Sequence, residues 1–249
     1  MNLKLEGKNV IITGGSDGIG KETARIMAEE GANVIIFARN IENLNKTRDE
    51  IKIKTGTAVE VHSVDVKDEK NVKETVDKVV EKNGNIDILV NNAGTSSAHP
   101  IMNITDQIMN DDLGTKLFGA IYVIQAVVPS MKKNGNGSIV NITTPGGKAS
   151  GANTVPTSVS RAAGISLTKA ISKELCEFNI RVNTVCVGLF KSGQHRKRYE
   201  SRVKDEPSLT IDEFYNQLGE SVPLGKRVGE AEEAAALIQF QQAFSANAR

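Results

Sequence analysis

Six short runs rich in β-branched residues alternate with longer segments of helical periodicity along the chain. The runs cover residues 9–13, 33–38, 58–64, 86–92, 138–143 and 180–187, and the helical segments cover 20–31, 41–55, 68–83, 104–132 and 158–177. Parallel neighbours need a long crossover connection, and nearly continuous apolar runs are typical of strands covered on both faces. The pattern therefore predicts an α/β fold: one domain over residues 1–249, a Rossmann-type doubly wound parallel sheet flanked by helices on both faces.

The charge balance and the cysteines indicate which partners and which cellular compartment to expect. With 31 Lys and Arg against 30 Asp and Glu, the net charge of +1 gives no global field for nucleic acid or an anionic membrane surface. No apolar run approaches the ~20 residues that span a bilayer. Cys176 and Cys186 lie in apolar sequence without metal-ligand spacing, so we expect reduced core thiols in a cytoplasmic protein. His62 and His99 lack partners at ligand or triad spacing, and we expect no metal.

Residues 13–20 read TGGSDGIG and connect the first predicted strand to the first predicted helix. In such a loop Gly14 permits a tight turn, Gly18 lets the backbone approach a diphosphate, and Gly20 lets the helix pack on the sheet. The free N–H groups at the helix N-terminus attract phosphate. The loop therefore predicts a dinucleotide site, and the alternative is a plain strand-to-helix turn.

The residue after the second predicted strand bears on the choice of dinucleotide. An acidic residue there accepts from the ribose hydroxyls of NAD, but this chain has Arg39. An arginine can pair with a 2′-phosphate, which favours NADP(H), with NAD(H) as the second choice. Asp17, inside the glycine loop, repels a phosphate and opposes this interpretation. Arg39 could instead be a solvated loop residue.

An ordered set of motifs is similar to that of a known family. TGGSDGIG, Asp65-Val66, NNAG at 91–94, GSIVNIT at 137–143 and IRVN at 180–183 resemble the short-chain dehydrogenase/reductases, in particular 3-oxoacyl-carrier-protein-reductase-like members. The resemblance covers roughly residues 5–240 and implies an NAD(P)(H)-dependent oxidoreductase acting on a small carbonyl or alcohol substrate, as a homo-oligomer. The cofactor-binding residues that it implies are Gly14, Ser16, Asp17, Gly18, Ile19, Gly20, Arg39, Asp65, Val66, Asn92, Ala93, Gly94, Arg161, Gly188 and Ser192.

The resemblance also locates an active site, where the sequence departs from the family. The family uses Asn, Ser, Tyr and Lys, and motif spacing carries these positions to Lys116, Thr144, Thr157 and Arg161. The three tyrosines of the chain lie elsewhere, so no register slip restores the motif. These four residues are therefore the candidate catalytic residues of a non-standard active site.

The substitutions change the acid–base chemistry of this site. The hydroxyl of Thr157 is a far weaker acid than a phenol, whose pKa is near ~10. Thr144 can still donate to a carbonyl oxygen, whereas Arg161 keeps a positive charge but releases no proton. Two cations in a partly dry pocket lower the pKa of a lysine, so Lys116 is a candidate acid or base in a rebuilt proton path. The alternative is a surface lysine extended along its helix.

Residues 190–224 correspond to the variable substrate lid of the family. Its basic run at 195–198 could receive a phosphate or carboxylate, or could be a solvated helix face, since acidic residues follow it. The tail at about 241–249 is atypical: the family's last strand is absent, so we expect an open edge on the sixth strand and loss of the subunit contact built there. The alternative is an isologous dimer through the helices at 104–132 and 158–177.

Two functions agree with these residues. The first is an NADP(H)-dependent reductase or dehydrogenase with a non-standard proton path. The second is a catalytically inactive NADP-binding pseudoenzyme that acts as a sensor or as an oligomer partner. A structural or interaction module explains neither the glycine loop nor the NNAG motif.

Overall fold

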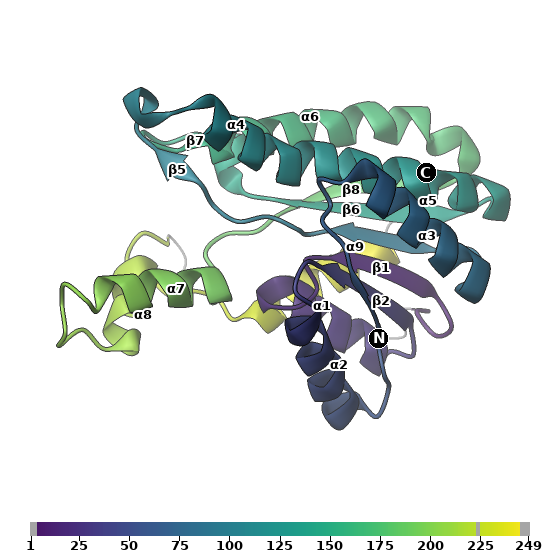
Figure 1. Ribbon diagram of the computed structural model, residues 1–249, viewed down its shortest axis with the longest axis horizontal. Helices are drawn as coiled ribbons and strands as arrows, with labels where there is room; N and C mark the ends of the chain where they lie inside the picture. Colours follow the sequence, from purple (N-terminus) through teal and green to yellow (C-terminus); the bar gives the residue numbers. More distant parts are fainter. Residues whose placement is uncertain (1–3, 223–224, 245–249) are drawn as a thin grey trace.

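The structure, a computed structural model, describes residues 4–222 and 225–244. Six parallel strands form one sheet in the order β3–β2–β1–β4–β6–β8 (Figure 1). Their bounds are β1 (Asn9–Thr13), β2 (Asn33–Ala38), β3 (Glu60–Ser63), β4 (Ile88–Asn91), β6 (Gly137–Thr143) and β8 (Ile180–Cys186). The chain returns from β3 at one edge to place β4 beside β1, which is the doubly wound order. The predicted Rossmann-type α/β fold is therefore confirmed, and the six predicted strands are those of this sheet.

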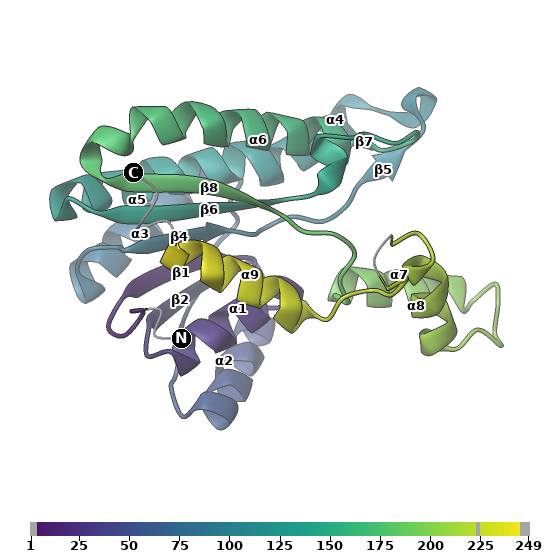
Figure 2. The same cartoon turned by 180° about the vertical axis from the view of Figure 1, so that it is seen from behind.

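Helices cover both faces of the sheet (Figures 1 and 2). One face carries α1 (Gly18–Glu29), α2 (Ile41–Thr55) and α9 (Ala231–Phe244), and the other carries α3 (Glu69–Asn83), α5 (Gly119–Asn134) and α6 (Thr157–Glu174). Along β1, Val10 and Ile12 belong to the core under α1, whereas Ile11 belongs to the core under α3 and α5. Because alternate side chains enter two different cores, the strand runs are apolar at nearly every position.

Polar caps fix where the helices begin at the carboxyl edge of the sheet. Asn40 accepts a hydrogen bond from the backbone N–H of Asn43 at 2.8 Å, and Asp68 accepts from Asn71 at 2.9 Å. Helix α2 ends at Gly56, whose φ of 77° is the left-handed conformation that glycine adopts readily. The N-termini of α2 and α3 therefore lie beside the carboxyl ends of the strands, where ligand crevices form in such sheets.

The helix predicted at 104–132 is observed as one helical run over 106–134 with a π-helical turn inside it. Helix α4 (Asp106–Leu113) leads into the π turn at Gly114–Phe118, which continues into α5. Turns of this type occur frequently at functional sites. Here the π turn carries Lys116, one of the candidate catalytic residues.

This run is long and apolar enough to cross a membrane by length and composition, so the sequence expectation of no such segment is corrected. In the fold, however, α5 packs on α3 and on strands β4 and β6. The run also carries two buried charged residues, Asp112 and Lys116. We therefore interpret it as a helix that covers the sheet, because charges at the centre of a membrane span are costly.

The predicted lid contains α7 (Gly193–Arg202) and α8 (Ile211–Gly219), which extend beyond one end of the sheet (Figure 1). Nearby, β5 (Ala98–His99) and β7 (Val155–Pro156) form a short antiparallel pair. Short 3₁₀ turns lie at Ile101–Asn103, Pro145–Gly147 and Cys176–Phe178. Strand β8 is at the edge of the sheet, and residues 245–249 of the predicted tail lie outside the described residues.

Both cysteines are free and exposed, so the expectation of core thiols is wrong. Cys176 lies in the turn that follows α6, where its Sγ donates to the carbonyl of Lys173 at 3.0 Å. Cys186 is the last residue of the edge strand β8. Apolar neighbours in the sequence do not bury a residue at the end of an element, where the chain returns to the surface.

Candidate functional site

The glycine loop after β1 has the geometry of a backbone cradle. Gly14 and Gly18 have φ of 66° and 53°, and a Cβ on Gly20 would collide with the carbonyl oxygen of Gly14. Asn92 ties the loop to the end of β4, since its Nδ2 donates to the carbonyls of Thr13 and Gly14, both at 3.1 Å. The loop and the NNAG motif are therefore one rigid unit at the carboxyl edge of the sheet.

Asp17 is the N-cap of α1. Its Oδ1 accepts from the backbone N–H of Gly18 at 2.8 Å. The first turn of α7 lies directly over it, since a Cβ on Gly193 would collide with Asp17 Oδ2. The carboxylate that opposed a phosphate site in the sequence thus has a structural role, and it satisfies one of the N–H groups of the helix N-terminus.

A cavity of about 560 Å³ opens between the glycine loop, the NNAG loop, the end of β6 and the lid. It is lined by these predicted site residues: Gly14, Asp17, Gly18, Ile19, Asn92, Gly94, Thr144, Thr157, Arg161, Gly188 and Ser192. Its volume lies in the range of about 300–1,000 Å³ that is typical of ligand pockets. The structure therefore brings most of the predicted cofactor residues together around one space.

The remaining predicted residues lie elsewhere. Ser16, Gly20, Arg39 and Asp65 do not line this cavity. Arg39 is exposed, and its backbone carbonyl accepts from the hydroxyl of Ser63 at 2.9 Å. Val66, Ala93 and Lys116 line a second, smaller cavity.

Lys116 is buried in an ion pair with Asp112, one helical turn earlier. Each side chain is 2% exposed, and Lys116 Nζ donates to Asp112 Oδ1. The other carboxylate oxygen, Oδ2, accepts from the hydroxyl of Ser160 on α6 at 2.6 Å. This excludes the surface lysine that the sequence left open as an alternative.

The pKa of Lys116 is lowered to about 8. Burial is the largest cause, because it removes the ammonium from water. The hydrogen bond and the charge of Asp112 oppose the shift, and the positive charge of Arg161 adds to it. An ammonium in this range loses and gains a proton near neutral pH, as a general acid or base requires.

The hydroxyl of Thr157 joins Lys116 to the large cavity. Thr157 Oγ1 accepts from Lys116 Nζ and from the backbone N–H of Ser97, both at 2.8 Å, and donates to the carbonyl of Ser97 at 2.8 Å. One hydroxyl has one donor and two acceptor positions, so this side chain is fully bonded within the protein. It also lines the large cavity, whereas Lys116 does not.

Arg161 lies between the two cavities and lines both. Its Nη1 donates to the carbonyl of Ile142 at 2.7 Å, while Nε is enclosed without a partner in the part of the chain that the structure describes. Burial lowers the pKa of Arg161, and the charge of Asp112 opposes that effect. Gly94 makes room for the cluster, since a Cβ there would lie 3.1 Å from Lys116 Cγ and 3.3 Å from Arg161 Nη2.

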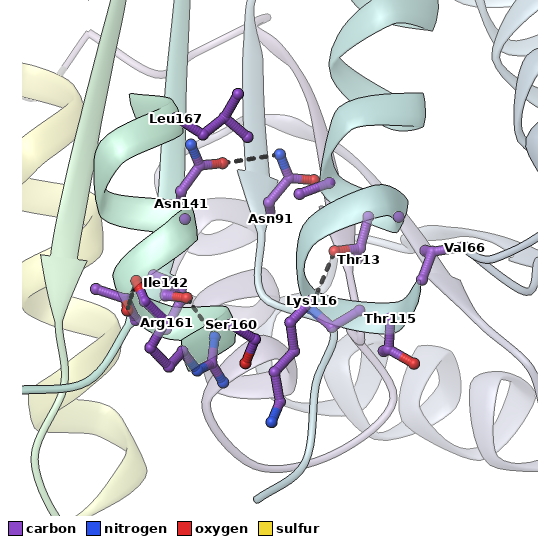
Figure 3. A pocket seen from close by; sticks show the side chains of 15 residues that line it. Thr13, Val66, Asn91, Thr115, Lys116, Asn141, Ile142, Ser160, Arg161 and Leu167 are labelled. Atoms are coloured by element: carbon purple, nitrogen blue, oxygen red, sulfur yellow. Dashed lines mark hydrogen bonds between the residues drawn. The ribbon is translucent and has the colours of Figure 1, made fainter. Parts of the chain in front are cut away.

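The smaller cavity, about 20 Å³, lies behind this cluster (Figure 3). Figure 3 shows Lys116, Ser160 and Arg161 on one side of it and the hydrogen-bonded pair Asn91–Asn141 on the other. Asn91 Oδ1 is enclosed without a protein partner among the described residues. A polar space of this size is suited to a single water molecule.

Sequence reasoning missed Asp112 and Ser160. The spacing of Asp112 and Lys116, four residues apart on one predicted helix, was a signal for an ion pair. It does not distinguish an exposed pair from a buried one. His62 bonds Glu60 at 2.7 Å and His99 bonds Ser97 at 3.1 Å, and no cluster of His, Cys, Asp or Glu in the described ranges could hold a metal ion.

A glycine loop and a large cavity at the carboxyl edge of a doubly wound sheet define the Rossmann-type class of α/β protein. The profile of the short chain dehydrogenase family matches residues 8–203. The 3-oxoacyl-[acyl-carrier-protein] reductase of Thermotoga maritima is 37% identical over 238 residues, which cover 96% of this chain and 91% of that protein. A sorbitol dehydrogenase of Cereibacter sphaeroides is 32% identical, over 96% of this chain and 91% of that protein.

Among solved structures, the L-sorbose reductase of Gluconobacter frateurii, in complex with NADPH and L-sorbose, superposes with a TM-score of 0.93. It is 29% identical and the match covers 99% of this chain and 93% of that one. The chain therefore belongs to the short-chain dehydrogenase family and resembles its 3-oxoacyl-carrier-protein reductases. This is a family of oxidoreductases that act on carbonyl and alcohol substrates.

Proposed function

We propose that the protein is an NADP(H)-dependent oxidoreductase that interconverts a carbonyl compound and its alcohol through a non-standard active site. The observation that carries the proposal is the 2.8 Å hydrogen bond from Lys116 Nζ to Thr157 Oγ1. It connects a buried ammonium, whose pKa is about 8, to a hydroxyl on the wall of the large cavity. A proton can thus reach a carbonyl oxygen in that cavity without a tyrosine.

The residues around the large cavity suit a dinucleotide. The loop at 13–20 offers backbone rather than side chains, at the N-terminus of α1. Gly94, Gly188 and Ser192, which line this cavity, would hold the nicotinamide half. The family resemblance assigns the adenine half to Asp65 and Val66, which do not line it. When bound, the nicotinamide supplies or accepts the hydride.

The preference for NADP(H) over NAD(H) rests on Arg39. This side chain is exposed and has no hydrogen bond or ion pair with the rest of the described chain, so it is available for a 2′-phosphate. The opposing charge of Asp17 is directed at the N–H of Gly18, which reduces its repulsion of a nearby phosphate. NAD(H) is the second choice.

The proton path begins at Lys116. In the reductive direction, the O–H of Thr157 turns from the carbonyl of Ser97 to the substrate oxygen and gives up its proton. Lys116 Nζ, already bonded to Thr157 Oγ1, replaces that proton at the same atom. The substrate oxygen gains one proton, Lys116 loses one, and Thr157 is unchanged.

Thr144 and Arg161 complete the site. Thr144 follows β6 and lines the large cavity, where its hydroxyl would donate to the substrate oxygen. Arg161 stays charged throughout and contributes to the low pKa of Lys116. Its place on the wall of the large cavity supports a contact with the cofactor ribose.

We further propose a cytoplasmic homodimer formed through the helices at 104–132 and 158–177, with no nucleic acid or membrane partner. Phe118 and Val159 support this arrangement, since both are exposed large apolar side chains on these helices. An isologous dimer would cover them with their own copies.

One observation favours a second function, an inactive NADP-binding protein that acts as a sensor or as an oligomer partner. Lys116 is 2% exposed, and all hydrogen-bonding positions of Thr157 are occupied within the protein. If Thr157 never leaves Ser97, the proton path stays closed and only cofactor binding remains.

Steady-state turnover of a carbonyl panel with NADPH and NADH, together with calorimetric titration of both cofactors, tests the proposal. We expect NADPH binding and measurable reduction, with kcat lowered by about 10²–10⁴ in Lys116→Met and Thr157→Val. Exposed Lys197→Met is the control. Tight NADPH binding without any turnover would favour the inactive protein, and absence of binding to either cofactor would contradict both functions.

A further inference from the structure

The basic run at 195–198 in the lid divides into two faces. His195 and Arg198 line the large cavity, and Arg196 and Lys197 do not. His195 is buried, whereas Arg198 is exposed like the other two. Residues three apart on a helix lie on the same side, which explains the division. The first turns of α7 thus present one imidazole and one guanidinium to the site.

His195 is held in one orientation by the chain around it. It is 7% exposed, and its Nδ1 donates to the carbonyl of Phe190 at 2.8 Å. Burial lowers the pKa of His195, the hydrogen bond to the Phe190 carbonyl opposes this shift, and the charge of Arg198 adds to it. The net direction is downward, which favours the neutral ring. With the proton on Nδ1, the other nitrogen, Nε2, is an acceptor without a partner in the described part of the chain.

Arg198 also has unused hydrogen-bonding capacity. No ion pair with a carboxylate joins it to the rest of the described residues. Asp17 is the acidic residue that lines the cavity, and it is committed to the N–H of Gly18. One helical turn of α7 therefore offers an acceptor and a cationic donor that have no side-chain partner among the described residues.

We propose that His195 and Arg198 together bind a hydroxyl group of the substrate, so that the protein acts on carbonyl compounds that carry hydroxyls rather than on plain hydrocarbon chains. A hydroxyl donates to His195 Nε2 and accepts from Arg198 at the same time. A carboxylate satisfies the arginine but cannot donate to a neutral imidazole. The inference rests on the proposed function and deepens it by naming the substrate class.

Matched ketones test this inference. The probes are 1,3-dihydroxyacetone and 4-hydroxybutan-2-one, their analogues pentan-3-one and pentan-2-one, in which a methyl group replaces each hydroxyl, and acetoacetate for the carboxylate arm. We expect kcat/KM to be at least about a hundredfold higher for the hydroxyketones, because a site that hydrogen-bonds a hydroxyl loses both of these bonds when the substrate lacks it. In His195→Phe and Arg198→Met, kcat/KM for the hydroxyketones should fall about 10- to 100-fold, with less than threefold change for the analogues.

Arg196→Met, on the outer face of the same helix, is the control and should change neither class of ketone. Equal losses for hydroxyketones and analogues would overturn the inference, as would a loss confined to acetoacetate. Weaker binding of NADPH alone to Arg198→Met would also overturn it, since the two side chains would then serve the cofactor's phosphates.

A readout without turnover separates this inference from the proposed function. Diethyl pyrocarbonate modifies neutral imidazoles, and mass spectrometry reports the modification at His195. In the presence of NADP⁺, 4-hydroxybutan-2-one should protect His195, and pentan-2-one should not. Protection without catalysis would support the hydroxyl site while contradicting the enzyme, and equal modification with both ketones would overturn the hydroxyl site even in an active enzyme.

Discussion

Replacing Asp112 by Asn should destabilise the protein and lower the pKa of Lys116, the proposed proton donor. The carboxylate is 2% exposed, holds Lys116 Nζ with one oxygen and accepts from Ser160 with the other. Its removal leaves an ammonium buried without a counter-charge, which costs about 3–5 kcal/mol. For a chain of this size that corresponds to a fall in Tm of roughly 6–20 °C. Because Asp112 raises the pKa of Lys116, the same substitution should move that pKa below about 8.

The double variant Asp112→Leu with Lys116→Met distinguishes the contribution of the ion pair to stability from its contribution to turnover. Both charges are gone and the volume is nearly kept, so we expect most of the lost stability to return. Ser160 retains a second acceptor in the carbonyl of Thr157 at 3.1 Å, so it is not left unpaired. Turnover should nevertheless remain reduced by about 10²–10⁴, because the proton donor is absent.

Thermal denaturation and pH-dependent steady-state kinetics on the wild type, Asp112→Asn and the double variant measure both effects. Asp111→Asn is the matched control, since its carboxylate is exposed and bonded to Lys67 and Gln107. A Tm fall below about 2 °C in Asp112→Asn would show that the pair is not buried as described. A stable double variant with full turnover would show that the pair is structural only, which would refute the proposed proton path.

Three further outcomes follow from the same geometry. Because the proposed reduction requires the ammonium form of Lys116, the kcat of reduction should fall as pH rises through about 8. Arg161→Met should move the midpoint of this fall to higher pH, since Arg161 lowers the pKa of Lys116. A pH-independent kcat would contradict Lys116 as the proton donor. Arg39→Gln should weaken NADPH binding about two- to fivefold and leave NADH binding unchanged in calorimetry, as for an exposed ionic contact. Equal losses for the two cofactors would show that Arg39 does not determine cofactor choice. Gly20→Ala should abolish thermal stabilisation by NADPH, because the added Cβ would collide with the carbonyl oxygen of Gly14.

The doubly wound parallel sheet was predictable because apolar strand runs alternate with segments of helical periodicity in this sequence. Runs such as NVIIT and NVIIFA are apolar at successive positions, and β1 indeed contributes alternate side chains to two cores. Caps such as Asn40 and Asp68 mark the helix starts within a residue. The π turn at Gly114–Phe118 was not predictable, since the local sequence there has no proline and reads as ordinary helix.

The charged centre of the site was only half predictable. Motif spacing locates Lys116, Thr157 and Arg161, but the sequence does not reveal that Asp112 enters the same buried space. Burial is decided by how α4 and α6 pack against the sheet, and an acidic residue on a polar helix reads as exposed by default. The two cysteines show the converse error: their apolar neighbours in the sequence indicated burial, but both are exposed.

In the proposed proton path, Lys116, Thr157 and Arg161 would replace the phenol by dividing two tasks differently among them. In the family pattern, one residue donates the proton and a lysine cation lowers the donor's pKa from near ~10. Here burial lowers the pKa of Lys116 itself, and Asp112 opposes that shift. Arg161 supplies the positive charge that the family's lysine would supply. Thr157 then needs only to convey a proton, for which an aliphatic hydroxyl suffices because it gains one as it loses one. The donor's strength is therefore set by how dry the space around Lys116 is, and any change that admits water there should raise its pKa and weaken it as an acid.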